Sequence, residues 1–340
     1  MCFSERPLFP GISSDCAIQI NSDELSEKTS FSGLLVGTLF LAGATSLPEV
    51  TTSLSAVFIG NPDIAIGNML GSNMFNLCII ACFDLYYRRI RLYQSVSGEH
   101  LYTAGLGFIL SLMILLALAR QSDYMVFGTG VDSLFIALIC VLGMYIISKM
   151  IQTGAAEPET PMNVSPSEAG QTAFSFKKTI AGFNLMALII TGAGSMRSFA
   201  GDEIADITGL GSSFVGSFLL AATTSMPEAI AVLVALHLKN VNLALGSILG
   251  SNIFNILILA GSDVFYQQGP ILSNISPVLH TASLSVSILS VMLIMALLQK
   301  KDIDYTLYDP FTADYCGVSL LVLYDLSRLN PKKQDMPKAR

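Results

Sequence analysis

The sequence has few of the side chains on which soluble enzymes and resident metal sites depend. Its 340 residues include no tryptophan, three histidines and six cysteines without a metal-binding spacing, so we expect no histidine- or thiolate-based metal centre. Only 13% of the residues are charged, against about 25% in a soluble domain. Residues 1–21 also lack the basic start and apolar middle of a signal peptide. These absences argue against a soluble enzyme, and we expect no nucleic-acid partner.

Long apolar runs are abundant instead. Hydrophobic residues make up 52% of the chain, and the mean hydropathy is +0.61. A helix needs about 20 residues to cross a hydrocarbon core of about 30 Å. Runs of this length occupy residues 33–59, 64–83, 101–119, 131–151, 178–200, 211–237, 243–262 and 275–298, and a weaker run occupies 311–327. The pattern predicts an all-α polytopic membrane protein with about nine transmembrane helices. A polar linker at 152–177 divides it into the halves 1–151 and 178–340.

The segment 42–76 is written a second time at 221–255. At a constant offset of 179 residues, 25 of the 63 positions in 22–84 are identical in 201–263, and the alignment needs no gap. Five predicted crossings separate the run 33–59 from its partner at 211–237. Because an odd number of crossings reverses a segment, we predict two inverted-topology repeats, as in many secondary transporters. The first repeat covers 33–83 and the second covers 211–262.

Each copy places a proline and a carboxylate in the middle of a span, where polar groups are expensive and are functional by default. Pro48 and Pro227 have no N–H to donate, so each should kink its helix. The carbonyl groups four residues earlier, at Ala44 and Thr223, then lose their helical partners. Such carbonyls are tolerated in a membrane only where they are buried or line a polar cavity.

Oxygen-bearing side chains share the helix faces around these prolines. Carboxylate, amide and hydroxyl oxygens are the ligands of hard cations such as Ca²⁺ and Na⁺. Glu49 and Glu228 together carry a charge that offsets one Ca²⁺, so we predict that they bind a metal cation near the bilayer midplane. The other oxygen donors are Thr45, Ser46, Ser72, Asn73 and Asn76, and in the second copy Thr224, Ser225, Ser251, Asn252 and Asn255. A single hydroxyl or amide can instead bond two helices together, and the glycines of 67–73 and 246–252 favour close helix packing.

These residues carry a resemblance to a known family. The motifs TSLPE at 45–49 and GNMLGSNMFN at 67–76 recur as TSMPE at 224–228 and GSILGSNIFN at 246–255. They resemble the two alpha repeats of the cation/Ca²⁺ exchanger superfamily, the sodium/calcium exchanger-like membrane antiporters. The resemblance covers about 22–84 and 201–263.

The resemblance implies roles for individual residues. Glu49 and Glu228 match the central acidic ligands that Ca²⁺ and Na⁺ share. Asn76 and Asn255 match the remaining central positions, and because both are Asn here, the ion stoichiometry and K⁺ co-transport stay open. The side-chain oxygen ligands would be Thr45, Ser46, Ser72, Thr224, Ser225 and Ser251, with backbone carbonyl groups from Ala42 and Ala221. The family usually has ten spans, and we expect the first to be missing, because residues 1–20 cannot cross a membrane.

The functional hypothesis is a secondary antiporter that exchanges Ca²⁺ for Na⁺ by alternating access, in a cell or inner membrane. It would need no cofactor, and its partners would be the transported Ca²⁺ and Na⁺ ions and the lipid bilayer. Two alternatives remain open: a Ca²⁺ antiporter coupled to H⁺ or K⁺, or a transport-dead truncated member that binds Ca²⁺ without moving it. We do not expect an enzyme, because the sequence offers no nucleophile–base pair. The oligomeric state does not follow from the sequence.

Overall fold

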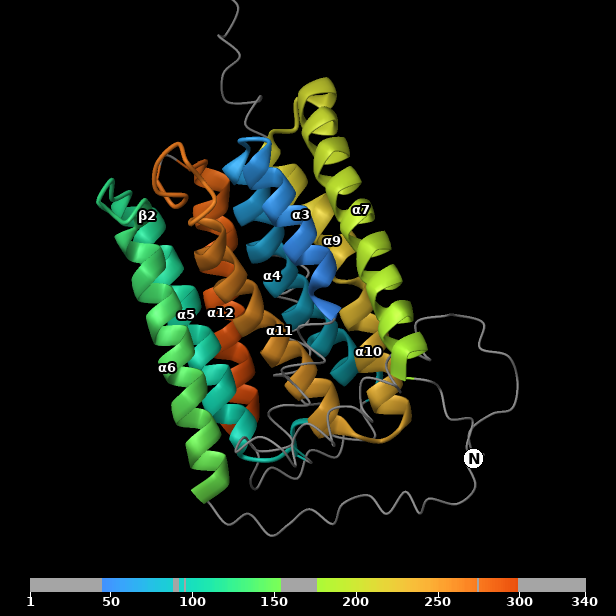
Figure 1. The fold of residues 1–340 in the computed structure, drawn as a ribbon. Helices are drawn as coiled ribbons and strands as arrows, with labels where there is room; N and C mark the ends of the chain where they lie inside the picture. Colours follow the sequence, from blue (N-terminus) through green and yellow to red (C-terminus); the bar gives the residue numbers. More distant parts are fainter. Residues whose placement is uncertain (1–44, 88–91, 95, 154–175, 274, 299–340) are drawn as a thin grey trace, which may run out of the picture.

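A computed structural model describes residues 45–87, 92–94, 96–153, 176–273 and 275–298, and it shows a bundle of long helices (Figure 1). Eight of the nine predicted apolar runs fall on described helices, at least in part. The ninth run, at 311–327, and the expected absence of a first helix lie outside the described residues, as does most of the linker 152–177. The long helices are α3 Leu47–Phe58, α4 Pro62–Tyr86, α5 Glu99–Arg120, α6 Val131–Thr153, α7 Phe176–Thr208, α10 Met226–His237, α11 Val241–Ser262 and α12 Pro277–Leu298.

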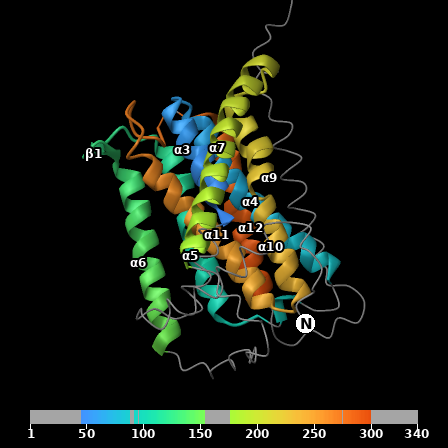
Figure 2. The same cartoon turned by 45° about the vertical axis from the view of Figure 1, so that its right-hand side comes forward.

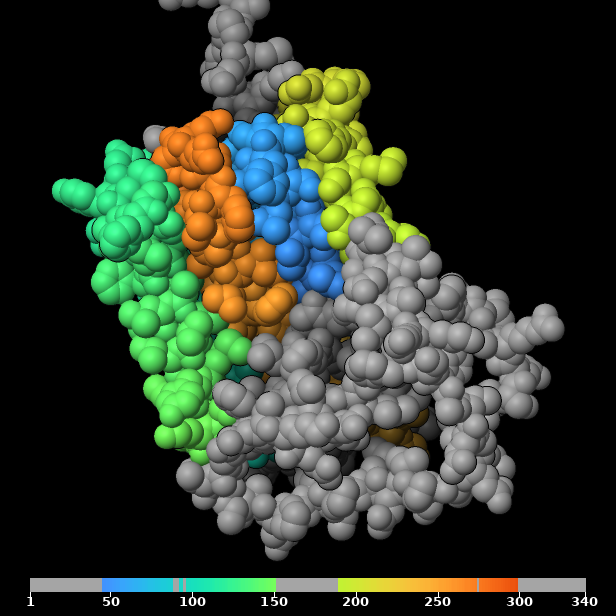
Figure 3. Space-filling model, in the orientation of Figure 1, coloured from blue at the N-terminus to red at the C-terminus, as the bar shows by residue number. Residues whose placement is uncertain are grey.

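The order of burial places α4 and α11 at the centre of the bundle. Six helical segments of the described chain are long and apolar enough to cross a membrane. In α4 and α11, 89% and 72% of the apolar window is buried, whereas in α6 only 22% is buried. The exposed side chains of α6 include large apolar residues such as Phe135 and Leu138, and α6 forms one edge of the molecule in the space-filling view (Figure 3). An apolar exterior around a more polar interior is the pattern of an integral, multi-pass membrane protein.

The two repeats lie antiparallel, as the sequence predicts. The N-terminal end of α4 meets the chain that follows α11, where the backbone N–H of Ser276 donates to Asp63 Oδ1 over 3.3 Å. The opposite end of α4 meets the end of α10, where Tyr87 Oη lies 3.4 Å from His237 Nδ1. The connection from α3 to α4 accordingly lies at the top of Figure 1, and the connection from α10 to α11 lies at the bottom. Equivalent helices therefore run in opposite directions.

The predicted run 211–237 is not one kinked helix, as expected, but a helix broken at Ser225. It consists of the short turn α8 Ser212–Phe214, the π-helical segment η2 Val215–Leu220 and α9 Ala221–Thr224, followed by α10. The break lies before the proline because Pro227 takes the second position of α10, where a missing N–H costs nothing. Pro48 has the same position in α3, after Ser46.

Helix α7 is longer than the predicted run 178–200. It continues to Thr208, so the acidic residues Asp202, Glu203 and Asp206 lie in its last turns and not in a loop. The amide of Asn61 donates to Asp202 Oδ1 over 2.7 Å and to Ser212 Oγ over 2.9 Å, which fastens this end of α7 to the start of α4. Along its length α7 packs beside α3, and Ser195 Oγ lies 2.9 Å from Ser55 Oγ (Figure 2).

The strands of the described chain form one small hairpin beyond α5. Strand β1 Met125–Val126 pairs antiparallel with β2 Thr129–Gly130. The buried carboxylate of Asp263 accepts the N–H of Gly130 over 2.8 Å and the N–H of Ile271 over 2.7 Å. The hairpin is thereby fastened to the connection between α11 and α12.

Candidate functional site

Two carboxylates lie at the centre of the bundle, one from each repeat. Glu49 and Glu228 are fully buried in the first turns of α3 and α10, immediately after the two helix breaks. Ser46 of the first repeat donates its hydroxyl to Glu228 Oε1 over 3.3 Å, so the two repeats meet at this point. The N-terminal ends of α3 and α10 favour negative charge through their helix dipoles.

The protein leaves three of the four oxygens of these carboxylates without a hydrogen bond. Both oxygens of Glu49 and Oε2 of Glu228 are buried without a hydrogen-bond partner. Thr224 lies beside Glu49, and Thr45 and Ser251 lie beside Glu228, so each carboxylate is faced by the threonine of the opposite repeat. Buried carboxylates without donors are costly unless a cation or a proton compensates them.

The next layer comes from α4 and α9. Ser72 Oγ lies 3.0 Å from Thr224 Oγ1, and the Thr224 hydroxyl lies 3.2 Å from both Asn68 Oδ1 and the carbonyl oxygen of Ala221. The carbonyl group of Ala221 also accepts the N–H of Ser225 over 3.0 Å, so it is already used twice. Ala42, the matching residue in the first copy, lies outside the described residues.

Four asparagines join α4 to α11. The amides of Asn73 and Asn252 donate to one another's backbone carbonyl oxygens over 3.1 and 3.4 Å. The amide of Asn76 donates to Asn252 Oδ1 over 3.0 Å, and the amide of Asn255 donates to Asn73 Oδ1 over 3.0 Å. The carbonyl oxygens of Asn76 and Asn255 remain buried without a partner. The same pattern occurs in both repeats, at the same offset of 179.

Seven buried oxygens of the predicted site residues have no hydrogen-bond partner. They are Glu49 Oε1 and Oε2, Glu228 Oε2, Asn76 Oδ1, Asn255 Oδ1, Ser225 Oγ and Ser251 Oγ. Few buried polar atoms in folded proteins lack a hydrogen-bond partner, so a group of seven indicates that a bound ion or proton is missing. Within the described part of the chain, no group of three or more His, Cys, Asp or Glu side chains could hold a resident metal ion. The arrangement suits a hard cation that is bound and released.

The structure brings together most of the predicted site residues. Glu49, Glu228, Asn76 and Asn255 are all fully buried, and the hydroxyls of Ser46, Ser72 and Thr224 bond across the repeats. Thr45, Ser225 and Ser251 lie among them, while Pro48 and Pro227 lie in the helix starts that carry the glutamates.

Arg197 is a residue of this region that the sequence analysis missed. It projects from α7, its Nη1 atom is buried without a hydrogen-bond partner, and it lies close enough to Glu49 to act on its charge. The signal was present in the sequence, because a single arginine within the apolar run 178–200 is expensive in a membrane. A fixed positive charge near the carboxylates should oppose the binding of a cation.

We therefore expect Arg197→Gln to raise the affinity for Ca²⁺. Removing a neighbouring unit charge should lower the dissociation constant roughly threefold to tenfold, and more for Ca²⁺ than for Na⁺, because the repulsion scales with ion charge. Isothermal titration calorimetry on the purified variant would measure both constants. Arg120→Gln is the control, because Arg120 pairs with Asp132 over 3.9 Å at a helix end and is largely exposed. Weaker Ca²⁺ binding by Arg197→Gln would contradict the argument.

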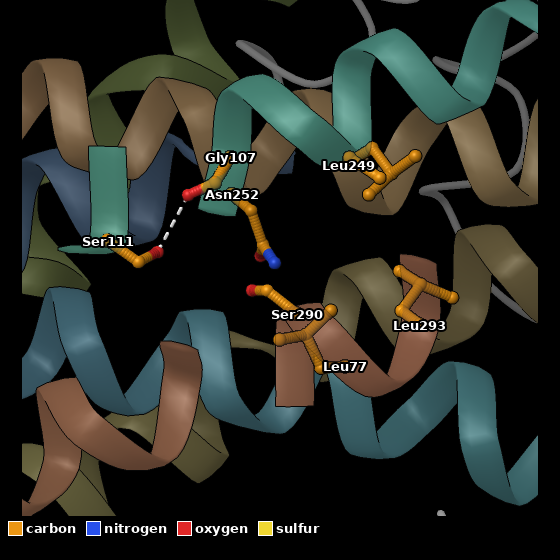
Figure 4. A pocket seen from close by; sticks show the side chains of 8 residues that line it. Leu77, Gly107, Ser111, Leu249, Asn252, Ser290 and Leu293 are labelled. Carbon is orange, nitrogen blue, oxygen red and sulfur yellow. Dashed lines mark hydrogen bonds between the residues drawn. The ribbon is translucent and has the colours of Figure 1, made fainter. Parts of the chain in front are cut away.

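A separate small cavity lies between α4, α5, α11 and α12, where the side chains of Asn252 and Ser290 point toward one another (Figure 4). It offers about 10 Å³, close to the ~10–15 Å³ that one water molecule needs. The hydroxyls of Ser111 and Ser290 donate over 2.8 Å to the carbonyl groups of Gly107 and Val286 in their own helices. The cavity therefore suits a water molecule rather than a second cation.

This cavity also shows that the duplication reaches further than 22–84. Ser111 and Ser290 are 179 residues apart, as are their partners Gly107 and Val286. The shared signal is the triplet Ile-Leu-Ser at 109–111 and 288–290.

Comparison with known proteins identifies similar membrane proteins and cation exchangers. A family model described as "Sodium/calcium exchanger protein" matches residues 12–154 and 178–326. The inner membrane protein YrbG of Escherichia coli K12 is 25% identical over 272 residues, which cover 78% of each chain. The sodium/potassium/calcium exchanger 2 of Gallus gallus is 40% identical over 67 residues, which cover 19% of this chain and 10% of that relative. A solved structure of the sodium-calcium exchanger NCX_Mj, soaked with Na⁺ and Sr²⁺, is similar in fold, with a TM-score of 0.55 and 19% identity, and covers 92% of this chain and 93% of that one.

Proposed function

The chain belongs to the sodium/calcium exchanger protein family, and on that basis we propose that it exchanges Ca²⁺ for Na⁺ at the oxygen site between Glu49 and Glu228. Family membership makes it an integral membrane cation antiporter of the Ca²⁺-exchanging kind. We propose in addition that transport is coupled to Na⁺, that the residues named here are the ligands, and that the mechanism is alternating access. The printed description of YrbG as an inner membrane protein supports the same kind of membrane here.

The observation that carries the proposal is the set of unpaired oxygens around two buried glutamates. Glu49 and Glu228 contribute the acidic oxygens, and Asn76 and Asn255 contribute neutral ones. Two negative charges balance one Ca²⁺, and oxygen ligands from carboxylates and amides suit both Ca²⁺ and Na⁺. One ion type would exclude the other by occupying the same ligands.

The inverted repeats support an alternating-access mechanism. The equivalent helices α3 and α10, which begin immediately after Ser46 and Ser225, carry the glutamates from opposite directions to the same place. In transporters of this construction, rocking of one unit against the other exposes a midplane site to each side in turn. Moving two unneutralised carboxylates through an apolar barrier is costly, so the loaded protein should change state more readily than the empty one.

A second candidate is exchange that also uses K⁺. It is supported by the 40% identity over 67 residues to a protein named as a sodium/potassium/calcium exchanger. Because Asn76 and Asn255 are both amides, the site has fewer negative charges than one with a carboxylate at either position, and it is less suited to an additional cation. Na⁺-only coupling is therefore the first proposal.

Ca²⁺ uptake into proteoliposomes tests the function. Vesicles containing the 340-residue chain are loaded with Na⁺ and diluted into Na⁺-free buffer that contains radioactive Ca²⁺. We expect uptake that requires internal Na⁺ and is absent when choline replaces it. Uptake driven only by internal K⁺ or by a pH gradient would overturn the Na⁺ coupling, and Ca²⁺ binding without uptake under any gradient would overturn transport.

A further inference from the structure

The four asparagines between α4 and α11 form a hydrogen-bond network in which the orientation of each side-chain amide is determined. The network begins at the backbone carbonyl oxygens of Asn73 and Asn252. A carbonyl oxygen can only accept a hydrogen bond, so the side-chain group that faces it has to be an NH₂ group. The side-chain NH₂ groups of Asn252 and Asn73 therefore have to face these two oxygens.

The orientation of Asn73 and Asn252 in turn determines the orientation of the Asn76 and Asn255 amides. With its NH₂ group committed, Asn252 presents Oδ1 to Asn76, and Asn73 presents Oδ1 to Asn255, each over 3.0 Å. Asn76 and Asn255 must donate from their own NH₂ groups. Their side-chain carbonyl oxygens therefore point away from Asn252 and Asn73. An amide rotated by half a turn would bring two oxygens or two NH₂ groups together, so the usual ambiguity of amide orientation is removed here.

The two amides at the ends of this network, those of Asn76 and Asn255, are left with unpaired oxygens. Oδ1 of Asn76 and Oδ1 of Asn255 are buried and have no partner, as are the oxygens of Glu49. A cation is attracted by a carbonyl oxygen and repelled by an NH₂ group. At these two positions, therefore, the orientation of the amide decides whether it can serve as a ligand.

We propose that Asn73 and Asn252 are positioning residues, which hold the carbonyl oxygens of Asn76 and Asn255 in the direction that receives the transported cation. This inference rests on the proposed function of the glutamate site and names what orients its neutral ligands. Asn73 and Asn252 do not touch the cation. Each acts through one hydrogen bond to a ligand amide and one to a backbone carbonyl oxygen, both in the opposite repeat.

The test is a pair of variants whose hydrogen-bonding pattern depends on pH. In Asn252→Asp, a protonated carboxyl group offers one O–H donor and one carbonyl acceptor, the same pattern as the amide. The ionised form offers only acceptors and would face the carbonyl oxygen of Asn73. Buried carboxyl groups favour the protonated form, so this exchange can be followed at ordinary pH. Asn73→Asp is the equivalent variant in the other repeat.

We expect both variants to bind Ca²⁺ at low pH and to lose binding as the pH rises. Calorimetry would measure the Ca²⁺ dissociation constant of each purified protein between about pH 6 and about pH 9. The ratio of the variant constant to the wild-type constant should grow by at least about tenfold across this range, as for loss of a hydrogen bond to a charged or buried group. In Asn252→Leu, which keeps the volume and has no donor or acceptor, binding should be weak at every pH.

The wild type also carries titratable groups in these helices, so its Ca²⁺ dissociation constant is measured at every pH and used as the reference. They include Glu49 on α3, Glu228 on α10 and the thiol of Cys140 on α6, whose Sγ lies 4.0 Å from the carbonyl oxygen of Ile253. Asn240→Asp is the matched control. Asn240 caps the start of α11 by accepting the N–H of Leu243 over 2.9 Å, which aspartate does equally well, so its ratio should stay flat.

The outcomes separate this inference from the proposed function. A flat ratio for Asn252→Asp and Asn73→Asp, or wild-type binding by Asn252→Leu, would overturn the positioning role. A wild type that binds Ca²⁺ without Na⁺-driven uptake would remove the proposed coupling, while the pH dependence of binding still decides the role of the asparagines. A wild type that binds no Ca²⁺ would overturn both.

Discussion

Glu49→Gln and Glu228→Gln each abolish Ca²⁺ uptake and leave the protein folded: this is the largest effect that we expect. Each substitution keeps the shape of the side chain and removes one of the two negative charges that would face the cation. Breaking a buried charge pair by removing one member costs about 3–5 kcal/mol, so Ca²⁺ affinity should fall at least about a hundredfold. Proteoliposome uptake measures the loss of transport, and calorimetry measures the loss of binding.

Folding should survive because protein donors satisfy only one of the four carboxylate oxygens. Both oxygens of Glu49 and one oxygen of Glu228 have no partner to lose. Thermal unfolding in detergent should therefore occur at or above the wild-type temperature without Ca²⁺, and added Ca²⁺ should no longer raise it. Glu203→Gln is the control, because Glu203 is exposed on α7. Transport that persists in either glutamine variant would remove that glutamate from the site.

Gly71→Ala is the second large effect, and it acts on packing. A Cβ atom at Gly71 would overlap the backbone carbonyl oxygen of Ser217 and would lie 2.6 Å from the Cβ of Ala221. Neither backbone can move away freely, because α4 packs against η2 and α9 along this face. Overpacking costs about 1–3 kcal/mol and occasionally more, and an overlap with backbone atoms places Gly71→Ala at the upper end. We expect a large drop in the unfolding temperature and in the yield of folded protein.

The same substitution should also impair the site. The close approach at Gly71 places the neighbouring Ser72 hydroxyl 3.0 Å from Thr224, and separating α4 from α9 would open that contact. The control is Gly107→Ala, because a Cβ there meets nothing within 4 Å. Gly107→Ala should keep or slightly raise stability, by at most about 1 kcal/mol, since alanine favours a helix over glycine. Fluorescence-detected size exclusion and thermal unfolding compare the two variants, and equal behaviour of both would refute the packing argument.

Much of the architecture could be predicted from the sequence because it is written in patterns along one chain. Hydropathy locates the helices, since each span has to be apolar to lie in a bilayer. The constant offset of 179 residues reveals the duplication, and counting crossings gives its inversion. The buried carboxylates of Glu49 and Glu228 are recognisable without a structure, because a charged group in an apolar run requires a reason.

Local details of the helices were predicted less well. The second copy breaks at Ser225 instead of kinking at Pro227, because a proline fits the first turn of a new helix better than a helix interior, and Pro48 takes the same position in α3. Helix α7 continues past the predicted end at residue 200 to Thr208, and Asn61 binds Asp202 in this extension. Hydropathy cannot locate such ends, because helix geometry extends past the apolar part of a span.

The sequence by itself therefore determined the class of protein, the inverted repeats and the pair of acidic residues, since each depends only on residue type and spacing. Only the tertiary structure decided which atoms meet: that Arg197 approaches Glu49, that Asn73 and Asn252 bond to one another's backbone, and that Asn76 and Asn255 are left with unpaired oxygens. The physical reason is that an amide is the same residue in either orientation. Its direction depends on the hydrogen-bond partner that a helix 179 residues away places beside it.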